Sequence, residues 1–159
     1  MQEQQLLDQM IALSGKKLEL LGNLKSLSEE QIKAFRDKDL DGIERILNRK
    51  DEIIEYVQKL DQAFLATSEN LKRLLGIESL EALSGTSLNG RHELKKMIEE
   101  ITGIIEAVIS LEKDSFSSAS ALKDELGGKI KDVNAGKKLT SAYSLKPTSS
   151  PSYFFDKKK

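Results

Sequence analysis

The chain has 159 residues, of which 32% are charged and 38% are hydrophobic, and its formal net charge is −1. This length predicts one domain, or a domain with a tail, and the balance of residues is typical of long, solvated helices. The absence of cysteine excludes disulfides, zinc-thiolate sites and thiol nucleophiles. The opening sequence Met-Gln-Glu-Gln-Gln has no basic segment and no apolar core, so we expect a soluble protein without a secretory signal or membrane insertion.

Charge is distributed unevenly along the chain. Residues 129–159 hold eight Lys and two Asp, a net charge of +6, which leaves −7 for residues 1–128 because the total is −1. A basic segment can bind nucleic acid, anionic lipid or an acidic protein groove, or it can serve only for solubility. We expect no nucleic-acid partner, because the acidic body of the chain would repel phosphate.

The first predicted element is a long amphipathic helix over residues 2–36. Apolar residues recur there at steps of three, four or seven, which keeps their side chains on one face of a helix. They are Leu6, Met10, Leu13, Leu20, Leu24 and Leu27. Lys17 and Gln31 lie on the same face, and polar residues in such positions set register or partner choice in helical bundles.

A second helix is predicted over residues 40–75, after a polar break at residues 36–42. In this break, Asp39 or Asp41 can accept hydrogen bonds from the free amides that open the next helix. Helical spacing continues to Gly76, a residue suited to the left-handed position that ends a helix. Each helix would be about 50 Å long at about 1.5 Å per residue, so we expect antiparallel packing into an elongated, coiled-coil-like bundle.

A third long helix is predicted over residues 89–126, after a glycine-containing connector. Its apolar stripe comprises Leu94, Met97, Ile98, Ile101, Ile104, Ile105, Val108, Leu111 and, more sparsely, Phe116, Ala119 and Leu122. Four serines at 115–120 and two glycines at 127–128 weaken its end, because glycine costs about 1 kcal/mol relative to Ala in a helix. We expect fraying or a hinge there.

The helical spacing resumes beyond the two glycines. Leu126, Ile130 and Val133 are four and three residues apart, which predicts a short amphipathic helix over residues 129–135 that forms when its apolar side contacts a groove. The sequence therefore predicts an all-α fold, with a helical bundle over residues 1–135 and a flexible or docking tail over residues 136–159.

The predicted tail is rich in Ser, Pro and Lys, yet it holds four of the eight aromatic residues of the chain. These are Tyr143, Tyr153, Phe154 and Phe155. An exposed ring gains nothing to offset the entropy lost when a segment becomes ordered, so the rings indicate docking to a partner surface. The alternative is a tail that folds back onto its own helices.

The sequence contains no set of residues typical of an enzyme. His92 is the only histidine, and three residues before it lies Asn89 instead of the Glu that di-iron bundles use. Acidic pairs such as Glu29 and Glu30 are consecutive, so they point about 100° apart on a helix and form no acid/base pair. Phosphate-binding loops, nucleophile elbows and dinucleotide motifs are also missing from the sequence. We expect no enzymatic activity, no metal and no cofactor.

The layout and the chain end resemble a known family. Three long helices precede a Lys-rich break, an isolated Tyr143, and the sequence SPSYFFDKK at residues 150–158. This arrangement resembles the FlgN family of flagellar export chaperones. The second predicted helix is also similar to that family's pattern, at Leu40, Ile43, Leu47, Lys50, Asp51 and Ile54.

The resemblance implies a cytoplasmic chaperone that binds hook-filament junction proteins, prevents their premature assembly and delivers them to the flagellar type III secretion apparatus. Terminal segments of such substrates are expected to be amphipathic helices, which a helix-lined groove can cover. The candidate substrate-binding residues are Leu122, Leu126, Ile130 and Val133 as a movable helical contact, and Tyr143, Tyr153, Phe154 and Phe155 as tail anchors.

Two other functions stay open on the sequence alone. The first is a structural coiled-coil scaffold that forms homo-oligomers through its wide apolar stripes and uses the tail to lock the assembly. The second is a membrane-surface binder that acts through the basic tail. The acidic polar faces of the helices argue against the membrane, because membrane-surface helices carry basic ones.

Overall fold

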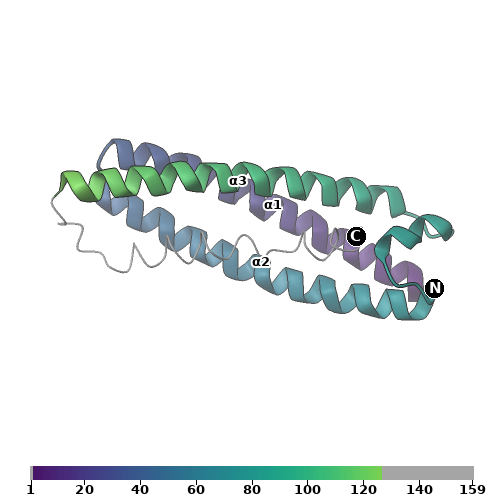
Figure 1. Ribbon diagram of the computed structural model, residues 1–159. Coiled ribbons are helices and arrows are strands. Elements are labelled where there is room, and N and C mark those ends of the chain that lie inside the picture. The colour runs from purple at the N-terminus through teal and green to yellow at the C-terminus, as the bar shows by residue number, and fades with distance from the viewer. Residues whose placement is uncertain (1, 127–159) are drawn as a thin grey trace.

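The computed structural model describes residues 2–126, which form three long α-helices and one short 3-10 helix. The elements are α1 (Gln2–Arg36), α2 (Leu40–Leu75), η1 (Leu80–Gly85) and α3 (Arg91–Glu125). Figure 1 shows the long helices side by side in one elongated bundle, with α2 antiparallel to both α1 and α3. Within residues 2–126 there is no strand, and the predicted all-α class with long, bundled helices is confirmed.

Two predicted segments lie outside the described residues. They are the short helix at 129–135 and the tail at 136–159, so the predicted division into bundle and tail stays a prediction. The third helix begins at Arg91, two residues later than expected. Gly90 precedes it with a φ of 96°, a left-handed backbone conformation that interrupts the helix at that point.

The corner between α1 and α2 is fixed by local hydrogen bonds. The Asp39 side chain accepts a hydrogen bond from the Gly42 amide at 3.0 Å, which caps the start of α2. The Asp39 amide donates to the Ala34 carbonyl at 2.9 Å, which closes the end of α1. These bonds involve only α1, α2 and their connection.

Helix α1 is the central element of the bundle. It packs closely along both α2 and α3, whereas α2 and α3 make few close backbone approaches to each other. Figure 1 shows α1 running along the bundle with both α2 and α3. Contacts between α2 and α3 are therefore made mainly by long side chains that reach across.

Three apolar clusters follow one another along the bundle. The η1-end cluster comprises Leu7, Met10, Phe64, Leu71, Leu83, Leu88, Leu94 and Ile98. The central cluster comprises Leu20, Leu21, Leu24, Ile53, Val57, Ile101, Ile105 and Val108. The corner cluster comprises Ala34, Phe35, Ile43, Ile46, Leu47 and Leu122, with Leu27, Ala119 and Leu126 packed against it.

The apolar stripe predicted for the third helix was wrong at Phe116. That side chain is 49% exposed, although the spacing placed it in the core, whereas Leu122 of the same stripe is buried and Ala119 packs against the corner cluster. The buried positions beyond Val108 are Glu112, Ser115 and Leu122. These positions keep steps of four, three and seven, so the inward face of the helix continues through polar residues and leaves Phe116 beside it.

We expect two of the helical glycines, Gly42 and Gly22, to respond differently to substitution by alanine. A Cβ at Gly42 would collide with the Asp39 carboxylate, whereas a Cβ at Gly22 meets nothing within 4 Å. Gly42→Ala should displace the cap, which costs about 1 kcal/mol and cancels the gain in helix propensity, so the free energy of unfolding should not rise. Gly22→Ala should raise it by about 0.5–1 kcal/mol through helix propensity. Urea denaturation measures both, and equal stabilisation by the two variants would contradict a role for the cap.

Candidate functional site

A layer of buried polar side chains separates the central cluster from the corner cluster. Lys50 of α2 forms an ion pair with Glu112 of α3, and both side chains are 0% exposed. Lys50 Nζ also donates a hydrogen bond to Gln31 Oε1 at 2.6 Å. Ser28 Oγ donates to Glu112 Oε2 at 2.7 Å. Because Ser28 and Gln31 belong to α1, this polar layer joins all three long helices.

Burying the ion pair removes both charges from water, and their mutual attraction must first offset that desolvation cost. Moving each charge out of water costs several kcal/mol, so a buried pair contributes little net stability compared with an apolar pair of the same size. Two further groups of the layer, Gln31 Nε2 and Ser115 Oγ, have no hydrogen-bond partner within residues 2–126. A buried polar group without a partner costs about 1–3 kcal/mol. We interpret the layer as a device that fixes register, since only one alignment of α2 and α3 pairs the two charges.

The electrostatic state of Lys50 follows from its burial. Loss of hydration lowers the pKa of Lys50 below its ordinary value of 10.5, and the charge of Glu112 partly offsets that effect. The hydrogen bond to Glu112 and the charge of Asp51 act in the same raising direction. Desolvation is the largest cause, so the folded protein holds the Lys50 proton less tightly than an unfolded chain does.

A second polar layer lies between the η1-end cluster and the central cluster. Lys17 Nζ of α1 contacts Asp61 Oδ1 of α2 at 2.7 Å, with side chains 5% and 17% exposed. Burial lowers the pKa of Lys17, and the Asp61 charge partly offsets the decrease. Polar and apolar layers therefore alternate along the bundle, and each polar layer holds one ion pair that involves α2.

Neither polar layer has the features of a catalytic site. Lys50 and Glu112 are fully buried, so no substrate reaches them. Within the described residues, no group of three or more His, Cys, Asp or Glu side chains is placed to hold a metal ion. His92 lies exposed near the start of α3. In that same part of the chain, no helix has an apolar stretch long enough to cross a lipid bilayer.

An open, largely apolar groove lies at the other end of the bundle, between η1 and α3. Its volume is about 440 Å³, and its apolar lining comprises Leu80, Leu83, Leu94 and Ile98. Arg91 holds η1 in place, because its Nε donates to the Leu88 carbonyl at 2.7 Å and its Nη1 donates to the Ser84 carbonyl at 3.0 Å. The rim carries charges of both signs, which gives the groove no preference for one class of charged ligand.

The structure describes two of the predicted substrate-binding residues. Leu122 is only 4% exposed and belongs to the corner cluster, and Leu126 packs against that cluster at the end of α3. The other six, Ile130, Val133, Tyr143, Tyr153, Phe154 and Phe155, lie outside the described residues. Leu122 and Leu126 lie near each other at one end of the bundle, but Leu122 cannot contact a partner while α3 stays packed.

Sequence reasoning identified part of the polar layers and missed the rest. Lys17 and Gln31 interrupt the apolar spacing of the first helix, and both are buried as partners of acidic or basic groups. Lys50 and Glu112 were missed as buried charges. The signal was present, because Lys50 lies three residues from Leu47 and from Ile53, and charges of opposite sign interrupt the stripes of two helices.

Comparison with known proteins supplies the family. A family model described as FlgN protein matches residues 1–114 of the chain. Searches of curated proteins and of solved structures found no match. The matched region contains α1, α2, η1 and most of α3, and it ends two residues after Glu112.

We expect the Lys50–Glu112 pair to behave as a coupled unit. Lys50→Met leaves the Glu112 charge buried without its ion pair and should lower the free energy of unfolding by about 3–5 kcal/mol. Adding Glu112→Met should restore most of that loss. The matched control is the exposed pair of Lys38 and Glu125, with side chains 55% and 52% exposed, where Lys38→Met should cost less than about 1 kcal/mol. Urea denaturation of Lys50→Met, Glu112→Met, the double variant and Lys38→Met measures the coupling, and additive effects at Lys50 and Glu112 would contradict it.

The contribution of Lys50 to stability should increase at alkaline pH. Folding lowers the Lys50 pKa below 10.5, so between the folded-state pKa and 10.5 the unfolded chain binds more protons than the folded protein. The free energy of unfolding then rises with pH in this window and is constant above it. The free energy of unfolding of wild type should therefore rise relative to that of Lys50→Met as pH rises from neutrality to 10.5. Lys17 titrates in both proteins, so its contribution cancels in the difference. A difference that shrinks with rising pH would contradict the lowered pKa.

Proposed function

Because the chain belongs to the FlgN protein family, we propose that it is a cytoplasmic chaperone that binds hook-filament junction proteins before their export. The family itself implies a general role in flagellar export. The proposal adds that the protein keeps its substrates from assembling too early and delivers them to the flagellar type III secretion apparatus. The observation that supports it is a family match over 114 residues that spans the first two long helices and most of the third.

The physical properties of the chain suit a binding protein. Its three helices offer a long, charged outer surface, and its buried charges are used for packing and not for chemistry. A substrate helix with an apolar stripe needs a groove lined by helices, which a bundle of this kind provides when one element moves aside. The family and the helical architecture together support a role in binding proteins.

The proposed substrate contacts lie beyond the matched region. Residues 115–159 include the end of α3 and the aromatic tail anchors, so their assignment rests on residue types in this chain. Tyr and Phe contribute large apolar area at low cost in side-chain entropy, and such residues dominate binding energy at interfaces. The Lys residues at the chain end contribute steering toward an acidic surface, an effect screened by salt.

We expect the full chain to form a one-to-one complex with a hook-filament junction protein in size-exclusion chromatography with light scattering. Replacing Tyr143, Tyr153, Phe154 and Phe155 by alanine should weaken the complex by at least about tenfold, because anchor residues typically contribute more than 1 kcal/mol each. The matched control replaces the three terminal Lys residues 157–159 by Gln, which should lower the association rate at low salt and leave the complex intact near physiological salt.

One outcome would contradict the proposed function, and another would contradict only the assignment of the tail anchors. If the full chain binds no junction protein and instead forms a stable oligomer that the alanine set abolishes, the chain is a self-associating scaffold. If the complex forms but the alanine set leaves its affinity unchanged, the chaperone function stands and the tail anchors are wrong.

A further inference from the structure

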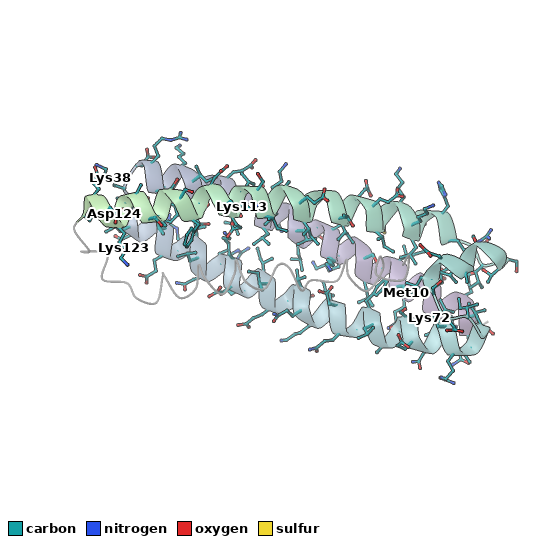
Figure 2. All side chains as sticks on the ribbon, viewed as in Figure 1. Met10, Lys38, Lys72, Lys113, Lys123 and Asp124 are labelled. Carbon is teal, nitrogen blue, oxygen red and sulfur yellow. The ribbon has the colours of Figure 1, made fainter. Side chains whose placement is uncertain are left out.

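The last turns of α3 are weakly held to the rest of the bundle. Between Phe116 and Glu125, Leu122 is the one buried residue. Serines at 117, 118 and 120 lower the helix propensity of this segment relative to alanine. The ion pair between Lys38 and Glu125 is solvent-exposed, with a distance of 2.7 Å, and exposed pairs contribute little. Figure 2 shows Lys38 at the same end of the bundle as Lys123 and Asp124.

The surface under this segment is built without it. Ala34 and Phe35 of α1 and Ile43, Ile46 and Leu47 of α2 form the rest of the corner cluster. The hydrogen bonds of the Asp39 corner hold these two helices together at this end and involve no residue of α3. Release of the end of α3 would therefore uncover an apolar face between two helices that stay joined.

The buried polar layer limits how far such a release extends. Glu112 is tied to Lys50 of α2 and to Ser28 of α1, and both bonds are buried. Opening beyond Glu112 would break this pair and also uncover the central cluster, where α3 contributes Ile101, Ile105 and Val108, whereas opening short of it frees one buried leucine. Opening of α3 from its end is therefore easiest up to the layer.

We propose that residues 116–126 are a displaceable lid, and that the face formed by Ala34, Phe35, Ile43, Ile46 and Leu47 is the receptor for an amphipathic helix of the exported protein. The chemistry of the partner is inferred from the segment of α3 that covers this face in the structure. Ala119, Leu122 and Leu126 are spaced three and four residues apart and pack on this face. A partner helix with apolar residues at the same spacing fits the same positions.

This inference rests on the proposed function for the identity of the partner, but the receptor can be tested without it. Two probes are used with the full chain: a hook-filament junction protein and a synthetic peptide with the sequence of residues 113–126. The peptide reports on the receptor alone, because it carries the residues that cover the face in the structure. Fluorescence anisotropy gives both affinities.

The decisive variant is Leu122→Ala in the full chain. A partner that binds only the open form has an apparent affinity equal to its intrinsic affinity multiplied by the fraction of open molecules. Removing the buried Leu122 side chain opens the lid, so both probes should bind at least about tenfold more tightly than to wild type. If Leu122 itself contacted the partner, the same change would weaken binding, so the two models predict opposite signs.

A second variant stabilises the closed lid and leaves its buried contacts unchanged. Ser117→Ala with Ser120→Ala, at two exposed positions, strengthens the helix of the lid and should weaken both probes several-fold. The matched control is Leu71→Ala, which removes a fully buried leucine from the η1-end cluster, away from the lid, and should leave both affinities unchanged. Amide exchange on the free variants checks that residues 116–126 open faster only in Leu122→Ala.

Each outcome decides the inference. Tighter binding of both probes to Leu122→Ala supports it. Tighter binding of the peptide alone supports the receptor and overturns the proposed class of partner. A junction protein that binds Leu122→Ala no better than wild type, together with a peptide that does not bind, overturns the inference and leaves the proposed function intact. If neither probe binds any form of the chain, both are overturned.

Discussion

The ion pair between Lys50 and Glu112 is the interaction on which the arrangement of the bundle depends. Helices α2 and α3 flank α1 and approach each other closely at few points along their backbones. Lys50 and Glu112 bridge that separation in the interior, with Gln31 and Ser28 of α1 bonded to the same two groups. Because charges can leave water only when they are paired, this contact allows one alignment of the three helices and penalises every shifted one.

The polar layers also divide the bundle into parts of unequal stability. At the η1 end, Leu7, Met10 and Leu71 are fully buried and Arg91 holds η1 against the start of α3. At the other end, α3 contributes one buried leucine beyond Glu112 and Ser115. Local opening concentrates where few apolar contacts hold a segment. The weakly packed end of α3 therefore begins directly after the Lys50–Glu112 pair, which fixes the alignment of the helices.

This division coincides with the limit of the family match. The match ends at residue 114, between Glu112 and Ser115, so the shared part of the chain is the bundle up to the polar layer. The end of α3 and the basic, aromatic segment after it lie outside the match. Binding residues are commonly carried on segments that a rigid scaffold positions.

Much of the fold was determined by the sequence alone. The three and four residue spacing of leucine and isoleucine, the capping residue Asp39 and the ending residue Gly76 are local signals, and they predicted the long helices and the corner between α1 and α2. The interruptions at Lys17 and Gln31 similarly identified two of the buried polar residues. Such signals need no knowledge of other parts of the chain.

Only the tertiary structure decided which residues of different helices meet. That Glu112 pairs with Lys50, that Phe116 lies half exposed and that Leu122 fills the corner cluster depend on how α3 is rotated and shifted against its neighbours. The apolar spacing of α3 fits more than one rotation, since Phe116 and Ser115 are adjacent on the helix surface. One rotation of α3 buries the ion pair, and another would bury the ring of Phe116. The difference in free energy between these rotations arises only when the three helices are packed together.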